Sequence, residues 1–180
     1  VCRLAGAERE SEWIKRIQSK GRVMTKDVLV SISGMHDELA EVAEIETEEA
    51  EAIEVITPAN YYFRNQKHYI VYDEAVEGTT EVIKNRIKIT GTDCVEIMKS
   101  GLSNSHMVFE RNKKNETFYR TPYGQMLVGV NTKNMKINVS EDNIDILIDY
   151  QLDVNHEPMA DCKIKMNITS KNSGDFSVIS

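Results

Sequence analysis

Hydrophobic and polar residues alternate along much of the chain, and the alternation is clearest in its C-terminal third. One face of an expected strand carries Ile144, Ile146, Ile148, Tyr150, Leu152 and Val154. The other face carries Asp145, Asp149, Gln151 and Asp153, with Leu147 as its apolar exception. Successive side chains of a strand point to opposite faces, so this pattern predicts one buried and one solvated face. Such strands are typical of antiparallel sheets.

Further alternating segments follow one another, separated by short turns that leave no room for a crossover helix. They predict strands at residues 25–33, 52–63, 67–75, 80–90, 94–100, 106–111, 117–121, 125–139 and 160–169. The alternation changes phase at Lys133 and Asn134, which predicts a β-bulge. Pro58 cannot donate to a sheet ladder, so we expect an edge or a bulge at that residue.

A meander of this length needs protection for its two edge strands, and closure into a barrel provides it. We therefore predict an all-β fold, an antiparallel up-and-down β-barrel of about eight to ten strands. A sandwich of two sheets is the alternative, although its connections would usually be longer. No βαβ unit is expected.

The chain divides into three expected regions: residues 1–23, 24–170 and 171–180. Residues 1–23 carry six basic and three acidic residues, and they form either an N-terminal helical extension or an artefact of the assigned start before Met24. Burial of Trp13, the single tryptophan, would distinguish the two. Residues 24–170 form a single β-barrel domain, and residues 171–180 a flexible polar tail.

Charge and composition exclude several classes of protein. The net charge of −7 argues against nucleic-acid binding, because phosphates need a surplus of Lys and Arg. No apolar run is long enough to span a membrane. Three cysteines at wide spacing match neither a disulfide framework nor a metal-binding knuckle. With no secretory signal evident, we expect a cytoplasmic protein without metal or cofactor. The acidic segment 37–54 fits a solvated loop or, alternatively, a cationic partner.

No recognised catalytic motif is present, and the four histidines are isolated. Tyr72 and Glu74 share one face of a strand, which would bring a carboxylate beside a phenol near the barrel mouth. The alternative is a solvated Glu74 at a strand end. Met107 and Phe109 share a face that suits either the core or an adaptable apolar pocket.

An aromatic turn around Pro122 is the third candidate constellation. It contains Tyr119 and Tyr123, and it fits either a rigid hairpin tip or the lid of a ligand site. The candidate ligand-binding residues are therefore Tyr72, Glu74, Met107, Phe109, Tyr119, Tyr123 and Tyr150.

Several short motifs occur together in one order along the chain. They are residues 97–101 (IMKSG), 106–110 (HMVFE), 119–124 (YRTPYG), 132–133 (TK) and 150–152 (YQL). In this combination the chain resembles the YwiB-like proteins of Gram-positive bacteria over about residues 25–169. The resemblance implies a calycin- or lipocalin-like barrel, and it implies no activity because the function of that family is unknown.

Three functions remain open at this point. The first is binding of a small apolar or amphipathic ligand inside the barrel, which requires a cavity. An interior filled by Ile146, Ile148, Ile164 and Met166 would contradict it. The second is hydrolysis of a small metabolite by Glu74 with Tyr72, Tyr119 or Arg111. The third is a solid barrel that binds a protein partner, and a homodimer through an edge strand is also open.

Overall fold

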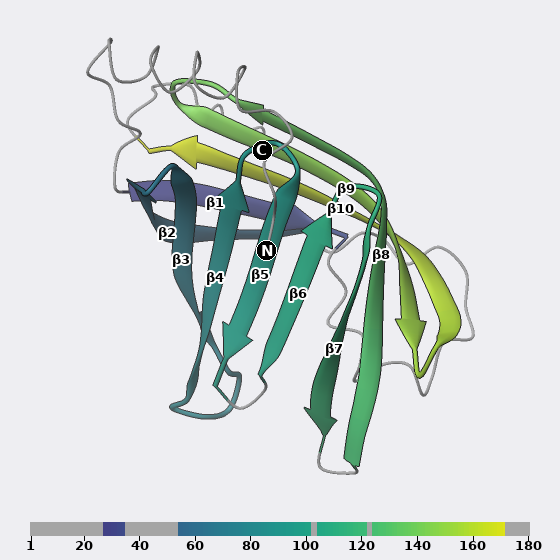
Figure 1. Cartoon of the computed structure of the whole chain (residues 1–180). Helices are drawn as coiled ribbons and strands as arrows, with labels where there is room; N and C mark the ends of the chain where they lie inside the picture. Colours follow the sequence, from purple (N-terminus) through teal and green to yellow (C-terminus); the bar gives the residue numbers. More distant parts are fainter. Residues whose placement is uncertain (1–26, 35–53, 102–103, 122–123, 172–180) are drawn as a thin grey trace.

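The computed structural model describes residues 27–34, 54–101, 104–121 and 124–171, and all regular structure within these ranges is β-sheet (Figure 1). The strands are β1 (Asp27–Ser33), β2 (Glu54–Arg64), β3 (Lys67–Ala75), β4 (Val82–Thr90), β5 (Cys94–Ser100), β6 (Ser105–Glu110), β7 (Lys114–Thr121), β8 (Gly124–Val139), β9 (Asn143–Val154) and β10 (Glu157–Ser170). These ranges contain no helix that could cross a membrane. The expected extension 1–23, the acidic segment up to residue 53, Tyr123 and most of the tail lie outside the described residues.

The ten strands form one antiparallel sheet that curls into a nearly closed barrel. Their order is β6-β5-β4-β3-β2-β1-β10-β9-β8-β7, so almost every strand pairs with its neighbours in sequence. β1 also pairs with β10, with Val28 opposite Ser170 and Ile32 opposite Met166. The predicted all-β, up-and-down barrel is confirmed, and a single sheet of ten strands is incompatible with the sandwich alternative.

The two edges of the sheet are β6 and β7, which are consecutive in the chain. Figure 1 shows them diverging from the turn that joins them. Near this turn, the Asn115 side-chain amide of β7 donates to the Val108 carbonyl of β6 over 3.3 Å. Among the described residues, the two edge strands are thus joined by this side-chain hydrogen bond and not by a β-ladder.

Two local irregularities lie where the sequence predicted them. The β8–β9 register shifts between Thr132 and Asn134, which confirms the bulge, and Lys133 is the extra residue. Pro58 lies in the first half of β2, which pairs with β1, whereas the β2–β3 ladder begins only at Asn60. Pro58 is thus on a locally one-sided part of the sheet, where its missing N–H breaks no second ladder.

One continuous hydrophobic core fills the barrel, and every strand except β7 contributes a buried side chain. On β9 and β10 the inward residues Ile146, Ile148, Ile164 and Met166 are all at most 3% exposed. Burial of each such side chain contributes about 1.5–3 kcal/mol to the free energy of unfolding. These four side chains fill the interior beneath β9 and β10. A ligand cannot therefore be bound deep inside this part of the barrel.

Candidate functional site

A row of polar side chains crosses β3, β4 and β5 on the inner face of the sheet. Tyr72 pairs with Asn85, Asn85 with Lys99, and Lys99 with Ser105 on β6. The first three are at most 8% exposed. They lie near the β3–β4 and β5–β6 connections, which are at the same end of the barrel (Figure 1). Together with Glu74 they form what we call the polar end of the barrel.

Glu74 is the solvent-facing member of the polar end. It lies two residues after Tyr72, so both side chains are on the same face of β3, and its own side chain is 45% exposed. Its Oε2 accepts a hydrogen bond from Asn85 Nδ2 over 3.2 Å and lies 3.7 Å from Lys99 Nζ. The Glu74 carboxylate therefore partly compensates the positive charge of Lys99, which is buried in the barrel.

The amide of Asn85 is only half satisfied. Its Nδ2 donates to Glu74 and, over 3.4 Å, to the carbonyl of Ile83. Its Oδ1 is fully buried and has no hydrogen-bond donor within the described residues. A buried acceptor without a donor costs about 1–3 kcal/mol. A lysine is also almost never fully buried unless it is paired, so two unusual polar groups are adjacent here.

The other candidates from the sequence lie deeper or apart. Met107 pairs with Ile97, one layer further into the barrel, and it packs half-buried against the core. Phe109 is fully buried one layer further on and packs edge-to-face on Tyr150, with 5.1 Å between the ring centroids. Tyr119 packs half-buried on the core from β7, and Tyr123 lies outside the described residues. The structure thus brings Tyr72 and Glu74 together and does not assemble all seven residues into one pocket.

Tyr150 belongs to the core rather than to a reactive site. Its hydroxyl shares a hydrogen bond with the thiol of Cys162, and burial, followed by this thiol, raises the pKa of Tyr150. Burial also raises the pKa of Cys162. Both groups therefore stay protonated at neutral pH, as expected for buried structural side chains.

Asn85 and Lys99 were not among the residues proposed from the sequence, although the sequence contains a signal for both. On the inner face of β4, Asn85 takes a place in the series Ile83, Ile87 and Ile89. Lys99 continues the series Val95 and Ile97 in β5 in the same way. A polar residue at a position that the alternation assigns to the core is an informative exception, and here it marks the site.

A second buried polar pair lies on β2 and β3, towards the opposite end of the barrel from Glu74. The Tyr61 hydroxyl is 2.9 Å from His68 Nδ1, and both side chains are buried. Burial lowers the pKa of His68 to about 4 and raises that of Tyr61. The imidazole is therefore neutral at physiological pH, and the pair is fitted to hydrogen bonding rather than to proton transfer.

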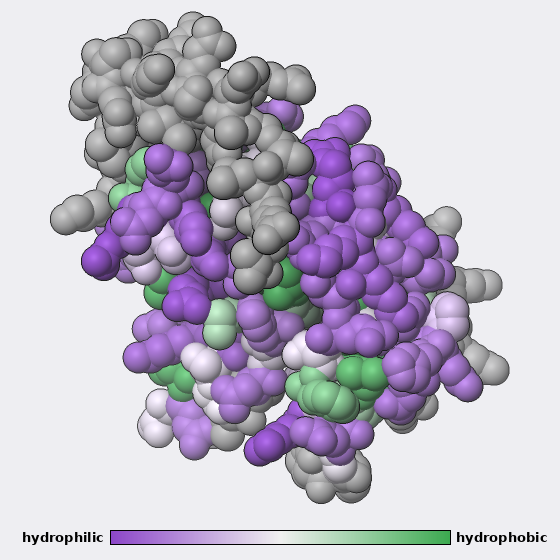
Figure 2. Space-filling model, viewed as in Figure 1, coloured by the Kyte–Doolittle hydropathy of each residue, from purple (hydrophilic) through white to green (hydrophobic). Residues whose placement is uncertain are grey.

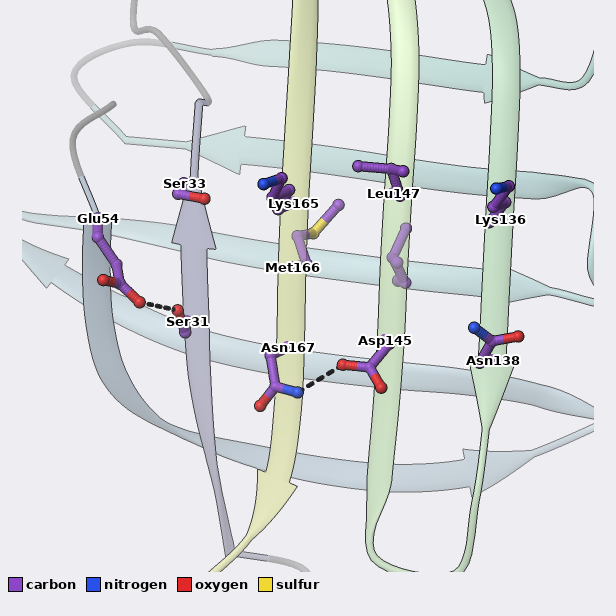
Figure 3. Close-up of a pocket in the computed structure, with 11 residues that line it drawn as sticks. Ser31, Ser33, Glu54, Lys136, Asn138, Asp145, Leu147, Lys165, Met166 and Asn167 are labelled. Carbon is purple, nitrogen blue, oxygen red and sulfur yellow. Dashed lines mark hydrogen bonds between the residues drawn. The ribbon is translucent and has the colours of Figure 1, made fainter. Parts of the chain in front are cut away.

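The outer face of the sheet is hollowed by a shallow groove of about 470 Å³ across β1, β10, β9 and β8. Figure 3 shows its two parallel rows of outward side chains. One row contains Ser31, Asn167, Asp145 and Asn138, and the other contains Ser33, Lys165, Leu147 and Lys136. Glu54 of β2 closes one side. No group of His, Cys, Asp and Glu suited to a metal ion occurs among the described residues.

The sequence profile of the family described as "Domain of unknown function (DUF1934)" matches residues 39–166. The fold is similar to that in the crystal structure of the YwiB protein from Bacillus subtilis, with a TM-score of 0.60. The two chains are 17% identical, and the match covers 85% of this chain and 97% of the other. No functionally curated protein matches. The resemblance inferred from the sequence motifs is confirmed, and at this identity the structural likeness concerns the fold alone.

Proposed function

The chain belongs to this family of unknown function, and we propose that it binds a small, partly apolar molecule at the polar end of the barrel. The observation that carries the proposal is the unsatisfied Oδ1 of the fully buried Asn85, which lies between Tyr72 and Lys99 on the two neighbouring strands. Small-molecule sites typically combine apolar walls with a few convergent polar groups. Buried polar groups in native proteins are nearly always hydrogen-bonded, so an unsatisfied one needs an explanation, and a functional role is one such explanation.

The chemistry of the polar end defines the head group of the ligand. Asn85 Oδ1 needs a hydrogen-bond donor, and Lys99 Nζ offers a charged donor to a carbonyl or carboxylate. The ligand head would compete with the half-exposed Glu74 for Lys99, whereas its apolar part would lie against Met107, whose flexible side chain adapts to different shapes. A primary amide on a hydrocarbon chain satisfies both requirements, because its NH₂ donates and its carbonyl accepts, whereas the carboxylate of a fatty acid satisfies only that of Lys99.

The filled core limits how far such a ligand reaches. Ile146, Ile148, Ile164 and Met166 occupy the interior under β9 and β10, so the proposed site is confined to the side formed by β3 to β6. This is a narrower proposal than a ligand in a central cavity. The ligand would be held at the barrel mouth, with its head group among the polar side chains and its apolar part against Met107, one layer further in.

Neither alternative function is favoured by the geometry. Arg111 Nε donates to Asp93 Oδ1 over 2.8 Å beside the β4–β5 turn, at the opposite end of the barrel from Glu74, so a hydrolase would lack this partner. Figure 2 shows a largely hydrophilic face with small, separate apolar patches, whereas protein-binding sites are usually marked by a larger one. A homodimer through β6 or β7 stays a prediction.

Native mass spectrometry of the freshly purified protein, followed by identification of any released molecule, is the direct test. We expect a stoichiometric adduct, or in its absence a thermal shift with decanamide or decanoic acid. Lys99→Met should abolish either signal, because it removes the charged donor and keeps the side-chain volume. Lys84→Met is the matched control, since Lys84 is exposed on the opposite face of β4, beside Asn85.

Two outcomes would overturn the proposal. One is an adduct or thermal shift that survives Lys99→Met unchanged. The other is a clean apo mass combined with no thermal shift for either compound, which would favour a solid barrel that binds a protein partner.

A further inference from the structure

The outer groove has an uneven pattern of satisfied and unsatisfied charges. Both carboxylate oxygens of Asp145 accept hydrogen bonds, Oδ1 from Asn167 over 2.6 Å and Oδ2 from Asn143 over 2.7 Å. Glu54 Oε1 accepts from the Ser31 hydroxyl over 2.7 Å. The acidic side chains of the groove are therefore already occupied by neutral donors.

The two lysines of the groove are in a different state. Neither Lys136 nor Lys165 has an ion-pair or hydrogen-bond partner within the described part of the chain. Lys163, on the same face of β10 and one row away, is in contrast paired with Asp149 over 3.5 Å. The groove thus holds unpaired positive charge, although the protein as a whole is negatively charged.

Leu147 lies between the two lysines. It pairs across β9 with Lys136 on one side and with Lys165 on the other, so the two lysine backbones are about 10 Å apart, twice the spacing of neighbouring strands. Figure 3 shows the half-buried Leu147 side chain flanked by both lysines. An apolar surface between two ammonium groups is suited to a ligand that has both an apolar face and an anionic group.

The adjacent row is suited to hydroxyl groups. Asn138 and Asn167 lie on either side of Asp145. The Asn167 Nδ2 already donates to Asn143 and Asp145 and its Oδ1 accepts from Thr169, whereas an unoccupied side-chain amide offers both donors and an acceptor. The Asn138 amide makes no hydrogen bond within the described residues, and Ser33 adds a hydroxyl at the β1 side. The volume of the groove is within the usual range for small-molecule sites, about 300–1,000 Å³.

We propose that the outer groove is a second binding site, for a sugar that carries an anionic group such as a carboxylate or phosphate. The anion binds Lys136 and Lys165, the C–H face of the ring packs on Leu147, and the hydroxyls bind Asn138 and Ser33. This site is on the opposite face of the sheet from the polar end of the barrel and does not depend on the function proposed there.

The test is titration of the ¹⁵N-labelled protein, followed by NMR, with four probes. Glucuronate and glucose 6-phosphate combine a sugar with an anion, whereas glucose and inorganic phosphate each supply one part. We expect both acidic sugars to shift resonances of Leu147 and its neighbours on β8 and β10. The two partial probes should bind at least about tenfold more weakly, because glucose lacks the charge-assisted hydrogen bonds to the lysines and inorganic phosphate lacks the ring that packs on Leu147.

Variants connect the binding to the groove. Lys136→Gln combined with Lys165→Gln should weaken binding at least about tenfold, whereas Lys163→Gln, at the already paired lysine, should leave it unchanged. Leu147→Glu should abolish binding, because it introduces a carboxylate between the two lysines. This side chain is on the outer face, so the core is unaffected.

Three results would overturn the proposal. The first is an absence of shifts with both acidic sugars at about 20 mM, a concentration at which even a weak site would be occupied. The second is equal affinity for inorganic phosphate and glucose 6-phosphate, which would indicate an adventitious anion only. The third is binding that survives the double lysine variant.

Discussion

Asn85 donates from its Nδ2 to Glu74 Oε2 over 3.2 Å, while the Oδ1 of the same amide is buried without a donor. The relationship fixes the orientation of the amide, because a flip would direct its NH₂ group away from the carboxylate. Glu74 therefore holds Asn85 with its acceptor unpaired beside the other polar side chains of this layer.

Asn85→Leu should separate stability from binding. Leucine has the same branched arrangement of side-chain heavy atoms as asparagine and removes the unsatisfied acceptor, so we expect the free energy of unfolding to rise by about 1 kcal/mol. Ligand binding at the polar end should be lost in the same variant, because the acceptor for the ligand is removed. Such a trade of activity for stability is common when a destabilising functional group is replaced. Urea denaturation measures the first effect. A variant that is less stable than the wild type would show that the Oδ1 has a stabilising role.

The pair of Glu74 and Lys99 should behave as a coupled unit. Glu74→Gln leaves a buried lysine without this carboxylate, and we expect a loss of about 1 kcal/mol in the free energy of unfolding, reduced by the solvent exposure of Glu74. In a Lys99→Met background the same change should have little effect. A double-mutant cycle by chemical denaturation gives the coupling, and equal losses in both backgrounds would contradict it.

His68 should make the protein acid-sensitive. Its pKa is lowered by burial to about 4 in the folded state, against about 6.5 in an unfolded chain. The unfolded state therefore binds a proton between these values and the folded state does not, so stability is lost as the pH falls from about 6.5 towards 4. We expect a loss of the order of 1–2 kcal/mol between pH 7 and pH 5.

The His68→Gln variant should show a smaller loss over the same interval, whatever its stability at pH 7. His156→Gln is the control, because the His156 side chain is 69% exposed. Urea midpoints at pH 7 and pH 5 compare the three proteins. If the urea midpoint of His68→Gln falls between pH 7 and pH 5 as much as that of the wild type, other groups cause the acid sensitivity.

Gly34 and Gly78 allow close packing to be separated from backbone strain. Both have φ near +75°, but a Cβ on Gly34 would lie 2.1 Å from the Lys163 carbonyl oxygen, whereas one on Gly78 would meet nothing within 4 Å. Gly78→Ala should cost about 1 kcal/mol for the left-handed conformation. Gly34→Ala should cost at least about 2 kcal/mol more, since the β1 and β10 backbones must separate. Similar thermal midpoints for the two variants would contradict the close approach.

The sequence predicts the local features of this fold better than its closure. The alternation in β9, the bulge at Lys133 and the one-sided pairing at Pro58 all depend on a few neighbouring residues, and all three are confirmed. The position of the seam between β6 and β7 depends instead on the twist accumulated over ten strands. No residue pattern in the sequence encodes that sum.

The candidate site was predicted in part for a similar reason. Tyr72 and Glu74 were found because they share a strand, whereas Asn85 and Lys99 come together with them only through pairing of three strands. The register that aligns them is a property of the sheet. The outer groove combines five strands in the same way, and its residues look like ordinary surface side chains when each strand is considered alone.

Because β1 pairs with β10, the first and last strands of the domain are neighbours, and the Lys171 amide donates to the Asp27 carbonyl over 3.3 Å. The strands therefore form a ring with two different breaks. β6 and β7 are consecutive in the sequence but form no ladder, whereas β1 and β10 form a ladder but lie at opposite ends of the sequence. A circular permutant that joined these two strands and began at β7 would make every strand pairing local. Its contact order would fall, and its folding would be faster than that of the natural chain order, which must close its longest loop to form the β1–β10 ladder.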